Sequence, residues 1–177
     1  MAKVVTGKVR LSYLHVFEPV AIGDSDQRKY SLSIIIPKSD KKTIARIEAG
    51  IKKTMEEGKA KWGGKIPKNL KLPLRDGDID REDDPAYENS YFFTASSRTR
   101  PGIVDRDLME IIDPEELYSG CYGRVSVNFY AFNTAGNKGI AAGLLNIQKL
   151  ADGEPLTSRS TPEEDFGDAE EEDDPLA

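Results

Sequence analysis

Hydrophobic and polar residues alternate along several short stretches of the chain, which is the pattern of half-buried β-strands. Residues 3–17 predict a strand with two different faces. Val9, Leu11 and Tyr13 fall on one face, and Lys8, Arg10 and Ser12 fall on the other. Residues 30–36 repeat the alternation, and Pro37 ends that strand because proline has no N–H to donate. Further strands are predicted over residues 91–97, 123–132 and 140–150, with a bulge or bend at Gly143 in the last.

One segment changes to a helical period. Four hydrophobic residues recur at the spacing of one helix face: Ile44, Ile47, Ile51 and Met55. Ser39 or Asp40 can cap the start, so a helix is predicted over residues 40–62. A single helical turn is expected after Asp113, because Pro114 suits the first helical position. Residues 63–90, rich in Gly, Pro and charge, are expected to form a long surface excursion.

About five strands with one helix between the early ones predict a mainly β domain, a small β-barrel of the OB-fold type. A β-sandwich is the alternative. Residues 152–177 hold few large apolar side chains and many acidic ones, so they cannot bury enough surface to offset their ordering entropy. The sequence therefore predicts an OB-fold-like domain over residues 1–151 and a disordered acidic C-terminal tail over residues 152–177.

The charge is divided unevenly between these two parts. The whole chain has a net charge of -6, but 11 of its 31 acidic residues and only one of its 25 basic residues lie in residues 152–177. The tail therefore carries -10 and the body +4. Such an asymmetry is typical of a nucleic-acid-binding surface or a regulatory tail.

Several classes of function are disfavoured by what the chain contains. One cysteine and one histidine cannot make an intrachain disulfide or a structural zinc site, and the cysteine count fits the cytoplasm. No phosphate-binding glycine motif or nucleophile elbow occurs, and no cofactor or metal is expected. No apolar run has the ~20 residues of a membrane helix, so no membrane association is expected.

An acidic cluster leaves one enzymatic alternative open. A Mg²⁺-dependent nuclease would use clustered carboxylates, for which Asp76, Asp78, Asp80 and Asp84 are the candidates. The simpler interpretation is a solvated loop whose acids pair with Arg75 and Arg81.

Aromatic and basic residues point instead to single-stranded nucleic acid, which binds where aromatic faces stack bases and Lys or Arg contact the backbone. Trp62 is expected to be exposed, because Gly and Lys surround it. The candidate DNA-binding residues are Lys8, Arg10, Trp62, Arg98, Arg100, Tyr122, Arg124, Asn128, Tyr130 and Phe132.

The acidic tail can act as a tethered mimic of nucleic acid that occupies a cationic groove until DNA displaces it. A third interpretation is a pure interaction protein whose tail mimics DNA. Two apolar tail residues, Phe166 and Leu176, are the candidate anchors for protein partners.

Four stretches in this order resemble a family of phage-encoded single-stranded-DNA-binding proteins once catalogued as a domain of unknown function: residues 73–78, 100–105, 117–124 and 138–144. The resemblance covers about residues 3–155. It implies an OB-fold, sequence-independent binding of single-stranded DNA (ssDNA), and a role in viral DNA replication and recombination in the cytoplasm of the infected bacterium. Related replicative proteins dock polymerase or helicase through a terminal aromatic residue, whereas Phe166 is internal here. The oligomeric state is left open.

Overall fold

The computed structural model describes residues 2–21 and 27–156. Eight strands lie in these residues: β1 (Ala2–Val5), β2 (Val9–Ala21), β3 (Arg28–Pro37), β4 (Arg75–Asp76), β5 (Ser90–Ser97), β6 (Gly102–Val104), β7 (Tyr122–Thr134) and β8 (Asn137–Ala151). The helical elements are α1 (Lys41–Glu57), η1 (Gly58–Trp62), α2 (Gly77–Asp80), η2 (Pro85–Tyr87) and η3 (Pro114–Glu116). No helix in this part of the chain is both long and apolar enough to cross a membrane.

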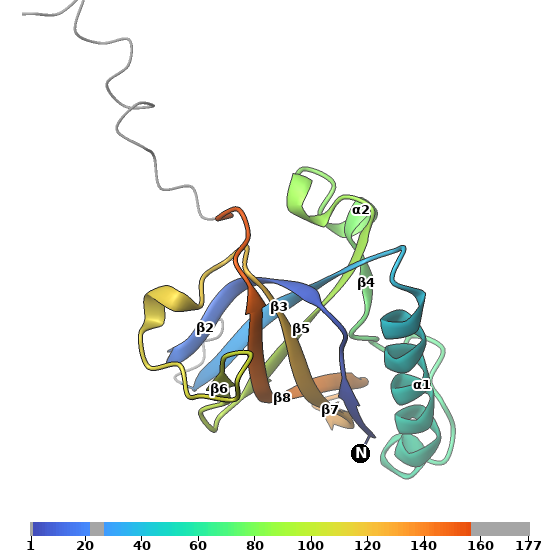
Figure 1. The fold of residues 1–177 in the computed structure, drawn as a ribbon. Helices are drawn as coiled ribbons and strands as arrows, with labels where there is room; N and C mark the ends of the chain where they lie inside the picture. The colour runs from blue at the N-terminus through green and yellow to red at the C-terminus, as the bar shows by residue number, and fades with distance from the viewer. Residues whose placement is uncertain (1, 22–26, 157–177) are drawn as a thin grey trace, which may run out of the picture.

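The strand pairings return to their starting point. β7 pairs with β2, β2 with β3, β3 with β5, β5 with β8, and β8 with β7, so five strands form a closed ring (Figure 1). The β5–β8 pairing is parallel and the others are antiparallel. The predicted mainly β fold of the OB type with one main helix is confirmed, and the β-sandwich alternative is wrong because the strands form one sheet.

The inside of the ring holds the main hydrophobic core. Alternate residues of each strand point inward, as the sequence pattern predicts for residues 30–36 and 123–132. The largest fully buried side chains on these inner faces include Leu11, Leu32, Ile34, Ile36, Phe93, Phe129 and Ile147. The opposite faces of the same strands are therefore free to carry polar and aromatic side chains.

The helix α1 packs beside β1 and β7 at one side of the barrel (Figure 1). Asp40 caps its N-terminus, where the carboxylate accepts a hydrogen bond from the Thr43 N–H at 3.2 Å. Gly50 faces Val4 and Phe129, and a Cβ at this position would collide with Val4. The predicted helix is confirmed, although its last turn, η1, is a 3₁₀-helix.

Strand β2 departs from the predicted alternation at Tyr13. This residue has a φ of +48°, and the pairing of β2 with β3 shifts register between Ser12 and His15. The resulting β-bulge exposes 57% of Tyr13, whereas Val9 and Leu11 remain buried. The prediction that Tyr13 shares the face of Val9 and Leu11 is wrong, because an irregular residue reverses the faces of a strand.

Two features of the last hairpin differ in detail from expectation. The turn is tighter than predicted, with only Ala135 and Gly136 between β7 and β8, both at positive φ. The register shift in β8 comes after Leu144, opposite Ser126 and Val127 of β7, whereas Gly143 pairs regularly with Asn128. The predicted bulge at Gly143 is therefore wrong by about two residues.

Residues 63–90 are more ordered than predicted. They include β4, α2 and η2 and lie against the outer faces of β3 and β5, where Tyr87 packs with Ile35 and Phe92 in a second small core. The Tyr87 hydroxyl shares a hydrogen bond of 3.0 Å with the hydroxyl of Ser33. Burial raises the pKa of Tyr87 above its usual value.

Residues 152–156, at the start of the tail that was predicted to be disordered, form a strap against the body. The Leu156 N–H donates to the Ser119 carbonyl at 2.8 Å, and the Leu156 side chain packs on the second core. Gly153 and Gly120 lie back to back, so that a Cβ on either would collide with the neighbouring backbone. The remainder of the predicted tail, residues 157–177, lies outside the described residues.

Candidate nucleic-acid interface

A groove of about 550 Å³ lies between two parts of the molecule, the start of β2 with Tyr122 of β7 on one side and the end of β3 with residues 85–90 on the other. Tyr122 forms part of the wall of the groove, and Arg10 on β2 is the direct strand partner of Tyr122. The Lys8 Nζ is 5.2 Å from the centre of the Tyr122 ring and the Arg10 Cζ is 5.7 Å from it. The structure thus brings together three of the predicted residues as one aromatic ring with two cations.

Arg10 is held in place without losing its charge. Its Nε donates to the Gly120 carbonyl at 3.2 Å, and its Nη2 donates to the Glu154 carbonyl at 2.7 Å. Both acceptors are neutral, so the guanidinium charge is not cancelled by a carboxylate in these contacts. The strap therefore positions a cation at the groove.

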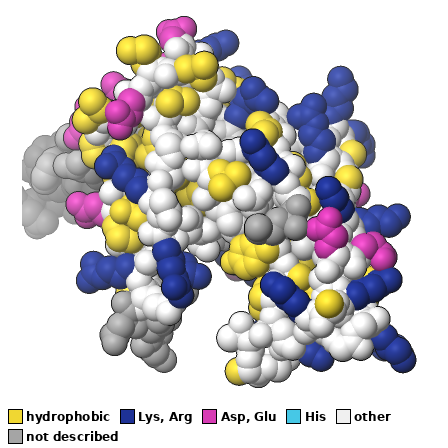
Figure 2. Space-filling view, turned by 90° about the horizontal axis from the view of Figure 1, so that it is seen from below, with side chains coloured by type: hydrophobic (Ala, Val, Ile, Leu, Met, Phe, Trp, Pro, Cys, Tyr) yellow, Lys and Arg dark blue, Asp and Glu magenta, His cyan; other side chains and the backbone are white. Residues whose placement is uncertain are grey.

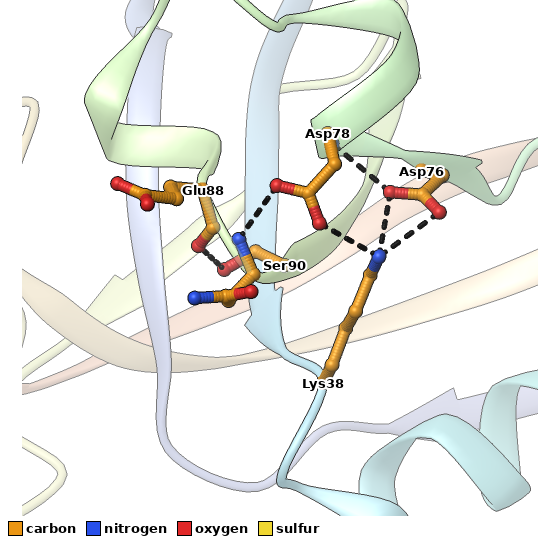
Figure 3. A network of polar contacts seen from close by, with 6 residues as sticks. Lys38, Asp76, Asp78, Glu88 and Ser90 are labelled. Carbon is orange, nitrogen blue, oxygen red and sulfur yellow. Dashed lines mark hydrogen bonds and ion pairs between the residues drawn. The ribbon is translucent and has the colours of Figure 1, made fainter.

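Lys38 also lines the groove, and its side chain pairs with acidic residues of the 63–90 segment. The Lys38 Nζ contacts Asp76 at 2.9 Å and Asp78 at 2.8 Å (Figure 3). Lys38 and the Asn89 N–H hold the pKa of Asp78 below its ordinary value, and Asp78 and Asp76 raise the pKa of Lys38. Two carboxylates neutralise this lysine, so it contributes less to an anion-binding surface than Lys8 or Arg10.

The carboxylates of the nuclease alternative have structural partners. Asp76 and Asp78 pair with Lys38, Asp80 lies 3.9 Å from the Nε of Arg75, and Asp84 caps η2 by accepting from the Ala86 N–H. Within residues 2–21 and 27–156, no three His, Cys, Asp or Glu side chains are grouped as metal ligands. The arrangement favours the solvated, locally paired loop.

Three further predicted residues follow the outer face of β7. Arg124, Asn128 and Tyr130 alternate with the buried residues of that strand, and the Arg124 Nε donates to the Thr6 carbonyl at 3.1 Å. The Tyr130 ring lies beside Gly143 of β8, which leaves space over the ring because glycine has no side chain. This face begins at Tyr122 and is therefore continuous with the groove.

The remaining predicted residues are spread around the barrel. Phe132 is half-buried near the end of β7 and lies against Gly139. Arg98 and Arg100 are exposed after β5, and the Arg100 Cζ lies 6.0 Å from the centre of the Phe17 ring. None of these three residues lines the groove that contains Tyr122.

The predicted exposure of Trp62 is wrong. Only 4% of this side chain is exposed, and its Nε1 donates to the Phe132 carbonyl at 3.0 Å. The ring fastens η1 to the end of β7 and belongs to the core. Neighbouring Gly and Lys residues mark the end of a helix here and carry no information on what the indole contacts.

Tyr13 is a further exposed aromatic residue, which the sequence pattern did not place on the outer face. Its side chain is exposed at the bulge of β2. The neighbouring Ser12 is the strand partner of Ser33, whose hydroxyl bonds to Tyr87, so the bulge lies close to the second small core. A bulky residue at positive φ is uncommon, and such backbone strain is found preferentially at functional positions. No sequence signal marks the bulge.

Lys and Arg side chains outnumber Asp and Glu on the face of the molecule seen from below, and they crowd the side of α1 at the right (Figure 2). A small barrel with exposed aromatic rings beside cations is the architecture of OB-type nucleic-acid-binding domains. The family model described as "Enterobacter phage Enc34, ssDNA-binding protein" matches residues 2–176, and the chain belongs to this family.

One curated relative and two solved structures are similar to this chain. "Putative protein p50" of Acyrthosiphon pisum secondary endosymbiont phage 1 is 33% identical over 184 residues, covering 96% of this chain and 97% of the relative. The solved structure of the ssDNA-binding protein from bacteriophage Enc34 in complex with ssDNA has a TM-score of 0.78 at 28% identity, covering 88% of this chain and 90% of that one. The ssDNA-binding protein gp2.5 of bacteriophage T7, at 14% identity and a TM-score of 0.66, covers 97% of this chain and 96% of that one and shows the shared fold.

Proposed function

We propose that this chain is a non-enzymatic protein that binds ssDNA without sequence preference. The observation that carries the proposal is the Tyr122 ring in the groove, with the Lys8 Nζ 5.2 Å and the Arg10 Cζ 5.7 Å from its centre. An aromatic face stacks any base, and the flanking cations neutralise phosphates. Its membership in the family of the Enc34 ssDNA-binding protein, together with that protein's structure in complex with ssDNA, supports the proposal.

Two lines of residues extend the site from Tyr122. One follows the outer face of β7 through Arg124, Asn128 and Tyr130. The other follows β2 through Arg10 to the bulged Tyr13. Binding would protect the displaced strand during phage DNA replication and recombination in the cytoplasm of the bacterial host.

A stacking surface needs unpaired bases, so we expect ssDNA to bind more tightly than duplex DNA of the same length. Each phosphate contact contributes about -0.7 to the slope of log affinity against log salt concentration. With roughly three to six cations at the site, the expected slope is about -2 to -4. Fluorescence titrations of a labelled oligonucleotide at several salt concentrations measure both quantities, and equal affinity for the two DNA forms would contradict the proposal.

We expect Tyr13→Gly to weaken ssDNA binding by about 1–3 kcal/mol, the value of one stacked base. Glycine adopts the φ of +48° at Tyr13 freely. The relief of about 1–2 kcal/mol of left-handed strain offsets the larger chain entropy of glycine, about 0.5–1 kcal/mol. Unfolding by denaturant should therefore change little. Tyr13→Phe keeps the ring and is the matched control; a Tyr13→Gly variant that binds normally would remove Tyr13 from the site.

The acidic tail is proposed to compete with DNA for the same surface. The strap contacts Arg10 and leads the chain to the edge of the groove at Leu156, which supports the proposal. The residues beyond it, 157–177, carry a net charge of -8. A tether of this length gives an effective concentration around the millimolar range, so even a weak contact keeps part of the population closed.

Ending the chain after Leu156 changes the net charge from -6 to +2 while keeping the strap. We expect this truncation to tighten ssDNA binding several-fold at low salt, with a smaller gain at high salt because screening weakens the competing contact. A tail of equal length with its Asp and Glu replaced by Asn and Gln should behave like the truncation. Unchanged affinity at low salt would leave the tail without an autoinhibitory role.

Protein partners are also proposed to dock on the tail. Replication proteins such as a polymerase or helicase would bind the acidic residues together with the apolar anchors Phe166 and Leu176, which lie outside the described residues. The test is a pull-down of the host and phage replication proteins with full-length and truncated chains. Equal capture by both chains would contradict tail docking.

A further inference from the structure

The turn that follows β6 exposes three large apolar side chains to solvent. Leu108 is 72% exposed, Met109 64% and Ile112 77%. We call these three residues the apolar knob. Single exposed hydrophobic residues are ordinary, but three together on one short segment are typical of an interaction surface.

Hydrogen bonds fix the backbone of the turn that carries the knob. Asp105 accepts hydrogen bonds from the Asp107 N–H at 2.8 Å and the Met109 N–H at 3.0 Å, and its own N–H donates to the Met109 carbonyl at 2.9 Å. The Arg106 guanidinium ties the turn to β8 through the Leu150 carbonyl at 3.2 Å. Leu108 has a φ of +64°, so the turn presents a bulky side chain outward in spite of backbone strain.

Three acidic residues and one cation, Arg106, lie beside the knob in the sequence. Asp107, Glu110 and Asp113 are all exposed beside it. A surface that fits the knob therefore needs a small apolar hollow bordered by basic side chains.

This chain carries such a hollow on its opposite side. A cleft of about 360 Å³ lies between β1 and α1. Its lining combines small or apolar residues with cations and contains no acidic residue: Val5, Ala49 and Gly50 with Lys3, Arg46 and Lys53. We call it the basic cleft. Figure 1 shows β6 on one side of the barrel and α1 on the other.

We propose that the apolar knob of one molecule docks into the basic cleft of a second copy of this chain. The contact joins two different surfaces, so it is heterologous and leaves a free knob and a free cleft at the ends of every assembly. Because the two surfaces lie on opposite sides of the barrel, repeated contacts build an open row of molecules. Such a row on one DNA strand makes binding cooperative, and this inference rests on the proposed ssDNA binding.

The test compares full-length proteins on two oligo(dT) ligands, a short one that holds a single molecule and a long one that holds many. Binding to the short ligand measures the groove alone, whereas the steepness of the isotherm on the long ligand measures contact between neighbours. Leu108→Asn with Met109→Ser removes the knob, and asparagine tolerates the left-handed backbone. We expect short-ligand affinity and thermal stability to be unchanged, and the cooperativity to fall by about fivefold or more, the cost of losing a central interface contact.

A charge exchange identifies the occupant of the cleft. Glu110→Lys and Lys53→Glu should each reduce cooperativity, and the double variant should regain it because the pair is restored with reversed signs. Non-cooperative binding by the parent protein, or cooperativity that survives loss of the knob, would overturn the inference. Cooperativity that disappears in the chain ending at Leu156 but survives in the knob variant would assign the cleft to the acidic tail instead. Failure of the parent protein to bind the short ligand would contradict the proposed function itself.

Discussion

Replacing Trp62 by alanine is expected to lower the free energy of unfolding by about 3–5 kcal/mol, the usual cost of deleting a buried indole. The ring is 4% exposed, and its removal also leaves the Phe132 carbonyl without the Nε1 donor. The ssDNA affinity of the molecules that remain folded should be that of the parent protein, because Trp62 lies inside the core. Denaturant unfolding and an oligonucleotide titration at a temperature where the variant is folded give the two values.

Trp62→Phe separates packing from hydrogen bonding. It keeps an aromatic ring and loses the donor, so it should be more stable than the alanine variant. The opposite pattern for Trp62→Ala, with normal stability and weakened DNA binding, would return Trp62 to the DNA-binding surface.

Tyr122→Ala is expected to weaken ssDNA binding by about 1–3 kcal/mol, which corresponds to roughly 5- to 150-fold in the dissociation constant. Tyr122 is half-buried at the groove, with the Lys8 Nζ 5.2 Å and the Arg10 Cζ 5.7 Å from its ring centre. Tyr122→Phe keeps the stacking face and should bind nearly as the parent protein does.

Tyr91 offers a matched control for this experiment. It is also half-buried and has a lysine, Lys38, 5.2 Å from its ring centre, but Asp76 and Asp78 neutralise that lysine. Tyr91→Ala should therefore leave ssDNA affinity nearly unchanged. Equal losses in the Tyr91 and Tyr122 variants would show that any aromatic truncation in the sheet disturbs binding, and would weaken the assignment of Tyr122.

The strands that regular alternation describes were predictable from the sequence. In β7 every second residue from Val125 to Ala131 is buried, so Arg124, Asn128 and Tyr130 fall on the outer face as expected. The pairing of Arg10 with Tyr122 was not predictable, because it depends on how distant strands meet in the closed ring. The sequence therefore contained the members of the groove but not their arrangement.

The predictions that were wrong have local physical causes. The bulge at Tyr13 adds an irregular residue to a strand whose composition gives no sign of it. Tyr87 lies in an acidic segment without periodicity, yet it is 1% exposed because the outer faces of β3 and β5 provide Ile35 and Phe92 to pack against. Composition describes a segment's solubility, whereas burial depends on which distant surface the segment meets.

The back-to-back glycines, Gly120 and Gly153, constrain how this protein can evolve. Any side chain at either position collides with backbone of the other segment, and Gly120 also has a φ of +113°, which favours glycine whether or not the strap is in place. A lineage that loses one of them releases the strap and with it the carbonyl that holds Arg10. Without the strap, selection on Gly153 disappears, whereas the positive φ still favours glycine at Gly120. The presence of Gly153 in a sequence therefore records whether the chain still leaves the barrel beside the groove.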